Sequence, residues 1–117
     1  MKSILENLNR SVGVIGSAVM TNDGMVVTSA MTHAAKEEVL AAIGSSLVIS
    51  AQKSLKSLHD AALQLMTIDG SRGKIVIVNA GSVFLLAITD STIALDQTML
   101  DIRAAVKKLH KVISLDA

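Results

Sequence analysis

The chain has 117 residues and a formal net charge of +1, so it lacks the large basic surplus of proteins that bind a phosphate backbone. Half of its residues are hydrophobic but only 1% are aromatic, which argues against stacking sites for bases, sugars or quaternary ammonium groups. It has no cysteine, which excludes disulfides, thiolate catalysis and cysteine zinc sites. By length we expect a single domain over residues 1–117, with an aliphatic core and no nucleic-acid partner.

Localisation follows from the same composition. No uncharged stretch reaches the roughly 20 residues that span a bilayer, so we expect no insertion into a membrane. The absence of cysteine is compatible with a reducing compartment. We therefore expect a soluble, cytoplasmic protein.

The first predicted helix begins at a capping-box pattern. Ser3 and Glu6 stand three residues apart, so the side chain of each could bond the backbone N–H of the other. The helix should then end near Asn9 or Arg10.

Two strands joined by a tight turn follow this helix. Residues 12–20 are apolar at both odd and even positions, as in a strand covered by helices on both faces. The pair Asp23-Gly24 between two apolar runs is a strong hairpin signal, since Gly24 can supply the positive φ of the turn. The segment 25–30 is then the returning antiparallel strand.

The segment 37–59 is the most clearly helical part of the chain. A helical period predicts an inward-facing stripe on it: Leu40, Ile43, Leu47, Ala51, Ser54 and Leu58. The opposite side carries no charge from residue 39 to residue 51, which is unusual for a solvated surface. We therefore predict a partner-binding face there, formed by Glu38, Val39, Ala42, Ser45, Ser46, Ile49, Lys53 and Lys56. A helix buried within its own core, or a tolerated exposed Ile49, is the alternative interpretation.

The second half of the chain predicts three more strands and a last helix. Segment 63–68 has a part-polar alternation and should be an edge strand, whereas 74–79 is rich in β-branched residues. Segment 83–89 is apolar on both faces and should be central. A 4-3-4-3-4 apolar spacing from Leu95 to Ile113 predicts an amphipathic helix that starts near residue 91 or 92. The whole order, α-β-β-α-β-β-β-α, predicts a three-layer α/β/α sandwich of the α+β class with a five-stranded antiparallel sheet.

No group of residues has the spacing of a catalytic, cofactor or metal site. The run from Gly70 to Lys74 resembles a phosphate-binding loop but opens a strand instead of a helix. The histidines are scattered, and Ser45-Ser46 lacks both a nucleophile elbow and an adjacent base. We therefore predict that the protein is not an enzyme and holds no cofactor or metal.

The last helix carries several cations away from its apolar stripe: Arg103, Lys107, Lys108, His110 and Lys111. A solvated face with cations near the helix C-terminus explains them. Contact with an acidic partner or acidic lipid is the alternative.

These patterns together resemble the Roadblock domain, the family of dynein light chains, MglB polarity regulators and Ragulator subunits. The resemblance runs from about Leu5 to Ile113 and is carried by these segments: Val12 to Met20, Asn22 to Ser29, the long helix, Ile75 to Asn79, Gly81-Ser82, Val83 to Thr89, and a helix opening on Leu95. Family members often have Asn-Leu-Gly at the start of the last helix, where this chain has Ala94-Leu95-Asp96.

The resemblance implies a homodimer, or a heterodimer with a related domain, in which edge strands join and the long helices lie side by side. The edge would be the strand with Leu63, Leu65 and Thr67. It also implies that the helix pair binds and regulates a small Ras-like GTPase. The alternative hypothesis is a structural adaptor, such as a motor-associated light chain, which binds a peptide or helix. A third hypothesis is a small-ligand sensor.

Overall fold

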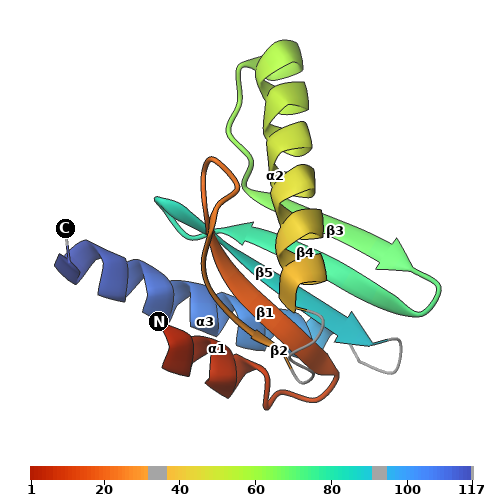
Figure 1. Cartoon of the computed structure of the whole chain (residues 1–117), viewed down its shortest axis with the longest axis vertical. Coiled ribbons are helices and arrows are strands. Elements are labelled where there is room, and N and C mark those ends of the chain that lie inside the picture. Colours follow the sequence, from red (N-terminus) through yellow and green to blue (C-terminus); the bar gives the residue numbers. More distant parts are fainter. Residues whose placement is uncertain (32–36, 91–94, 117) are drawn as a thin grey trace.

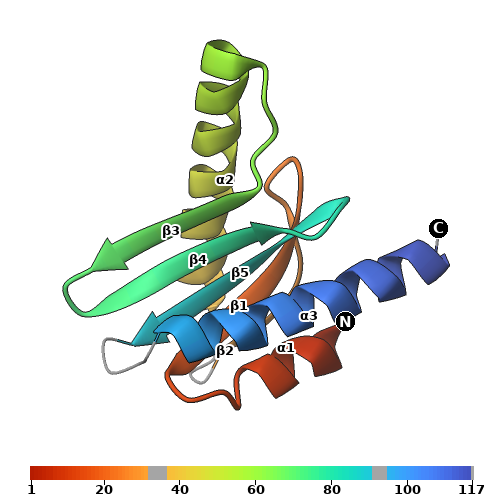
Figure 2. The same cartoon turned by 180° about the vertical axis from the view of Figure 1, so that it is seen from behind.

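The computed structural model describes residues 1–31, 37–90 and 95–116. Its elements are α1 (Lys2–Leu8), β1 (Val14–Thr21), β2 (Val26–Met31), α2 (Glu37–His59), β3 (Leu65–Gly70), β4 (Gly73–Asn79), β5 (Val83–Asp90) and α3 (Leu95–Asp116). The strands form one antiparallel sheet in the order β2-β1-β5-β4-β3. Helix α2 lies on one face, and α1 and α3 lie side by side on the other (Figures 1 and 2). The predicted three-layer α/β/α sandwich and element order are confirmed.

A separate hydrophobic core lies on each face of the sheet. On one face Leu5 of α1 and Ile102 and Leu109 of α3 are buried together with sheet residues such as Val76 and Leu85. On the other face Leu40 and Val48 of α2 are buried over Met20, Ile77 and Phe84. Strands β1 and β5 contribute to both cores, because alternate side chains of a strand point to opposite faces. This explains why both strands are apolar at odd and even positions.

Several element ends differ from the prediction. Helix α1 begins at Lys2 with Met1 as its N-cap and no side-chain capping bond, so the predicted Ser3 capping box is wrong. Its position is fixed instead by Leu5 and Leu8, which are both buried. Strand β3 begins at Leu65, two residues later than predicted. The predicted start of the last helix at residue 91 or 92 lies outside the described residues.

The buried side of α2 is also rotated from the predicted stripe. Its fully buried residues are Leu40, Gly44 and Val48, whereas Ile43 and Leu58 of the predicted stripe are exposed. Gly44 explains the rotation: a Cβ there would lie 2.9 Å from both Leu86 Cδ2 and Met20 Sδ, so only a glycine lets the helix approach the sheet this closely.

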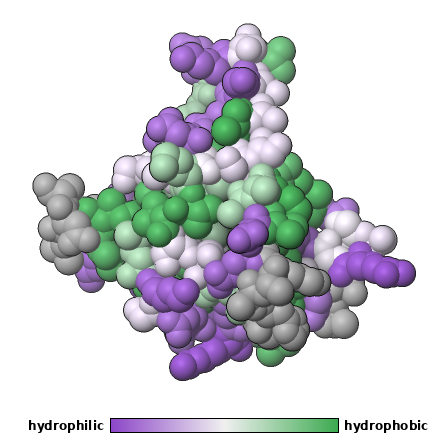
Figure 3. Space-filling view, in the orientation of Figure 1, coloured by the Kyte–Doolittle hydropathy of each residue, from purple (hydrophilic) through white to green (hydrophobic). Residues whose placement is uncertain are grey.

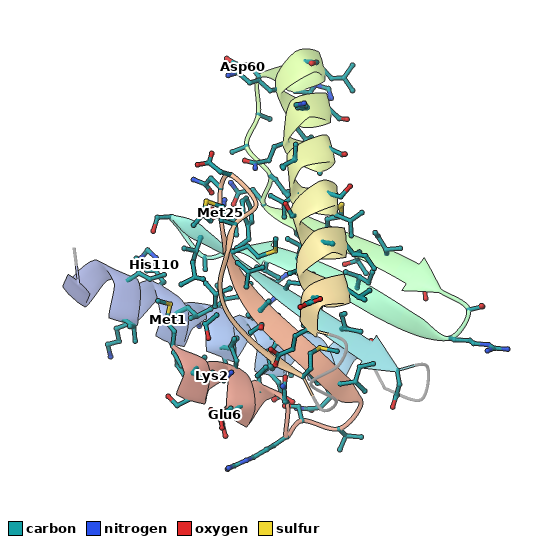
Figure 4. All side chains as sticks on the ribbon, viewed as in Figure 1. Met1, Lys2, Glu6, Met25, Asp60 and His110 are labelled. Carbon is teal, nitrogen blue, oxygen red and sulfur yellow. The ribbon has the colours of Figure 1, made fainter. Side chains whose placement is uncertain are left out.

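The C-terminal half of α2 extends beyond the edge of the sheet (Figure 1). The helix ends at His59, and the next residue, Asp60, has a left-handed φ of 50° and stands at the far end of the molecule (Figure 4). Leu58 is therefore exposed because no strand lies beneath it, although its spacing fits the apolar stripe.

Candidate functional site: the exposed sides of helix α2

One flank of α2 packs against the turn between β1 and β2. A Cβ added at Gly24 would lie 2.7 Å from Ser45 Oγ and 3.2 Å from Ile49 Cδ1. The Gln52 side chain donates a hydrogen bond of 2.7 Å to the carbonyl of Asn22. Gly24 has the predicted positive φ, 84°, which lets the turn lie flat against the helix. Ser45 and Ile49 are thus partly covered by the chain itself.

A shallow polar hollow of about 310 Å³ lies where this turn meets the helix. Its walls carry Asp23 from the turn and Lys53 and Lys56 from α2, with Ile49 as the apolar part of its lining. Both lysines are exposed, so their charges are well hydrated. The hollow offers mixed charge at the surface of the helix, and it contains no arrangement of a nucleophile and a base.

The opposite flank of α2 is apolar and uncovered. Ile43 lies two residues before Ser45, and therefore about 200° around the helix from the flank that the turn covers. It is 45% exposed, and Val39, one turn earlier on the same flank, is 56% exposed. Ser50 and Ser54 continue this flank with small side chains, and both are exposed.

The sheet beside this flank is also incompletely covered. Helix α2 packs mainly over β1 and β2, at one side of the sheet. On the same face Ile68 of the edge strand β3 is 38% exposed, and Met66 and Ile75 are only partly buried. Figure 3 shows hydrophobic surface beside the lower half of α2, over the first part of β3. We call the exposed set of Val39, Ile43 and Ile68 the helix–strand patch.

The two edges of the sheet differ in a way that matters for association. Strand β2 is irregular, with a register shift opposite Val19 and Met20, and its carbonyls accept side-chain bonds from Lys2 to Ser29 and from Asn9 to Ala30. Strand β3 pairs with β4 without interruption from Leu65 to Gly70. A bulged and capped edge resists pairing with another strand, whereas a regular edge favours it.

The predicted site residues divide among these surfaces. Glu38, Ala42 and Ser46 lie exposed on the outer side of α2, between the two flanks. Leu65 and Thr67 lie on β3 and are exposed, but on the sheet face that carries α3. Leu63 precedes β3 and is only 3% exposed, so its side chain belongs to the core under α2.

Sequence reasoning missed Ile43 and Ile68 as surface residues. The apolar period includes Ile43 and therefore predicts that it is buried, whereas Gly44, which packs against the sheet, carries no hydrophobic signal. For Ile68 the available signal was the alternation along the edge strand, which puts it on the same face as Met66.

The described part of the chain has no cluster of metal-binding side chains. Within it, no three His, Asp or Glu side chains are grouped so that they could hold a metal ion. The run from Gly70 to Lys74 spans the tight turn between β3 and β4, beside which Lys74 Nζ and Asp69 Oδ1 form an ion pair of 2.7 Å. Within residues 1–31, 37–90 and 95–116, no helix combines the length and apolar character needed to cross a membrane.

Known proteins share this architecture and sequence pattern. The uncharacterized protein MJ0714 of Methanocaldococcus jannaschii is 29% identical over 106 residues, covering 91% of this chain and 90% of its own length. A Roadblock/LC7 domain from Streptomyces avermitilis superposes with a TM-score of 0.83 at 13% identity, covering 97% of this chain and 98% of its own. The gliding protein MglB from Thermus thermophilus superposes with a TM-score of 0.82 at 20% identity, covering 95% and 86%.

The structural similarities by themselves show the fold, whereas the match to a family model shows the family. The model of the Roadblock/LC7 domain matches residues 2–90, from α1 to the end of β5. That range contains the whole sheet and the helix with the candidate site. The chain belongs to the Roadblock/LC7 domain family.

Proposed function

We propose that the protein is a non-enzymatic platform that forms a homodimer through β3 and the helix–strand patch, and that binds and regulates a small Ras-like GTPase. In this proposal residues 1–117 act as one Roadblock domain. The observation that carries it is the helix–strand patch, because its apolar side chains lie next to a regular, unpaired strand edge.

A second copy of the chain would cover the helix–strand patch and pair with the free edge of β3 at the same time. If two β3 strands pair along their edges, a two-fold axis brings a second α2 over the uncovered half of the sheet. Burying each exposed Val or Ile of the patch then contributes about 1.5–3 kcal/mol. Ser50 and Ser54 would let the two helices approach closely, since small side chains leave room for a neighbouring backbone.

The GTPase would bind the outer side of the paired helices. Glu38, Ala42 and Ser46 remain exposed there after the flanks are covered, and Lys53 and Lys56 extend this surface towards the polar hollow. The family resemblance supplies the class of partner, a small Ras-like GTPase.

The first experiment measures the mass of the purified protein by light scattering over a concentration series. A dimer of twice 12.2 kDa is expected, and a monomer at every concentration would contradict the dimer. A panel of small Ras-like GTPases, each loaded with GDP or a GTP analogue, is then tested for capture by the immobilised protein. We expect capture to depend on the nucleotide and to be lost in Ala42→Glu. Capture that is insensitive to the nucleotide would favour the structural-adaptor function.

A further inference from the structure

The face of the sheet opposite α2 is only partly covered by helices. Helix α1 contacts β1, β2 and α3, and α3 crosses the middle of the sheet, so β3 and much of β4 remain outside the helical layer (Figure 2). Leu65 of β3 points to this face and is 45% exposed. The axes of packed helices lie about 8–10 Å apart and neighbouring strands about 4.8 Å apart, so the open strip of β3 and β4 has about the width of one helix.

A groove runs between α3 and this open strip. Two adjoining hollows of about 410 and 270 Å³ share Gln64, Asn79, Val106 and Lys107 as lining residues, so they form one continuous depression. Val78 and Val106 give it an apolar floor. Leu65 lies directly opposite Val78 across the β3–β4 pair and extends the floor towards the sheet edge. We call this depression the α3–β3 groove.

The helix wall of the groove is cationic. Its two cations, Arg103 and Lys107, are four residues apart and therefore lie on one side of α3, and His110 follows three residues later on the same side. Figure 4 shows His110 on the side of α3 that faces the turn between β4 and β5, where its Nδ1 lies 3.3 Å from the carbonyl oxygen of Ala80. The side chains lining the two hollows include no acid. Charge complementarity therefore favours a ligand that carries negative charge.

The other flank of α3 has a different character. There a smaller hollow of about 130 Å³ is lined by Asp101 and Lys108 and is closed by Ile4 and Leu8 of α1. Charges of both signs meet in it, and α1 already occupies the position of a neighbouring helix. The hollow whose lining contains cations and no acid is thus the one on the flank of α3 that has no helix beside it.

The side chain of Asn79, which lines the groove, is already engaged in hydrogen bonds. The Asn79 side chain donates to the carbonyl of Leu63 at 2.9 Å and accepts from the N–H of Gly81 at 2.7 Å. Asn79 is therefore part of the groove wall, and the apolar floor and the cations are the groups available to bind a ligand. A concave floor also disfavours a lipid surface, because membrane-bound faces present protruding apolar side chains.

We propose that the α3–β3 groove binds an acidic amphipathic helix of a partner protein. Its apolar stripe would cover Leu65, Val78 and Val106, and its carboxylates would face Arg103 and Lys107. Strand β3 has six residues and is about 20 Å long, which a helix of about 13 residues would match. This site lies on the opposite face of the sheet from the proposed GTPase surface, so either proposal can fail without the other.

The test uses a phage-displayed library of random 16-residue peptides. Peptides are selected on the wild-type protein and counter-selected on the double variant Arg103→Glu/Lys107→Glu. The matched control is Lys108→Glu/Lys111→Glu, which makes the same change in charge on exposed positions of the same helix outside the groove. Circular dichroism confirms that both variants fold, and the affinity of each selected peptide is measured by fluorescence anisotropy.

We expect enriched sequences with acidic residues around apolar residues at i, i+3, i+4 and i+7, and a loss of affinity of about tenfold or more in the groove variant alone. In Leu65→Ser the affinity should also fall. No enrichment, enriched sequences without acidic bias, or equal loss in the control variant would each overturn the proposal. Binding to phosphatidylserine vesicles that requires Arg103 and Lys107, without peptide enrichment, would overturn it in favour of a lipid site.

Discussion

Ser45 of α2 lies directly over Gly24 in the turn between β1 and β2, so close that a Cβ on the glycine would be 2.7 Å from the serine Oγ. The contact joins two segments that are about twenty residues apart in the sequence. This contact sets the distance between the hairpin and the helix, and it therefore determines which flank of α2 is covered and which is exposed. The candidate site therefore depends on the conformation of this turn.

Gly24→Ala should destabilise the fold by about 1–3 kcal/mol. A methyl group there meets Ser45 and Ile49, and the residue must also keep a φ of 84°, which is strained for any residue with a Cβ. Urea denaturation measures the change in free energy of unfolding. Asp23→Ala in the same turn is the control, because Asp23 is exposed and has no positive φ, and it should change stability by less than about 0.5 kcal/mol. Equal effects of the two variants would contradict the tight contact.

The sequence predicted α2 accurately in its bounds but not in its orientation. Its ends at Glu37 and His59 follow from a long apolar period with acids in the first turn and cations in the last. The buried side is set by Gly44, and a glycine adds nothing to an apolar period. Which flank the hairpin covers depends on Gly24, and no pattern within the helix contains that information.

The sheet was predicted well because its pattern is local. Doubly apolar strands proved central and the part-polar strand proved to be an edge, since burial on both faces leaves no position for a polar side chain. The start of β3 was less predictable. Leu63 continues the alternation of the strand backwards, but in the structure it is held outside the strand, with its carbonyl bound by Asn79 Nδ2 at 2.9 Å.

Leu63 and Leu65 should therefore differ sharply in their contribution to stability. Leu63→Ala removes a side chain that is 3% exposed and should cost about 2–4 kcal/mol, whereas Leu65→Ala, at a position 45% exposed, should cost about 1 kcal/mol or less. Thermal and urea unfolding of both variants measure the difference. If both residues belonged to one strand, as the sequence pattern predicts, their side chains would lie on the same face and the two substitutions would cost similar free energies of unfolding.

The buried hydroxyl of Ser17 joins α1 to the sheet. It donates to Asn9 Oδ1 at 2.7 Å, and Asn9 Nδ2 in turn donates to the carbonyl of Ala30 at 2.9 Å. Asn9→Ala leaves the fully buried Ser17 with only a long bond of 3.4 Å to the carbonyl of Leu5 and should cost about 1–3 kcal/mol.

A double-mutant cycle with Ser17→Ala separates this effect from other losses. The double variant should be more stable than the sum of the single changes predicts, by about 0.5–2 kcal/mol, because removing both partners leaves no unpaired hydroxyl. The free energies come from urea denaturation of the four proteins. Simple additivity would mean that the two side chains act independently.

The last prediction concerns the helix–strand patch. Ile43→Glu and Ile68→Glu should each convert the proposed dimer into a monomer at concentrations where the wild type is dimeric, because each places a charge where an apolar side chain would be buried. Both positions are exposed in the single chain, so the monomer should keep its circular dichroism spectrum. Val27→Glu is the control, since Val27 is similarly exposed but lies on β2 at the opposite edge. Light scattering distinguishes the outcomes: dimers of both patch variants would place the interface elsewhere, and a monomeric Val27→Glu would point to the irregular edge instead.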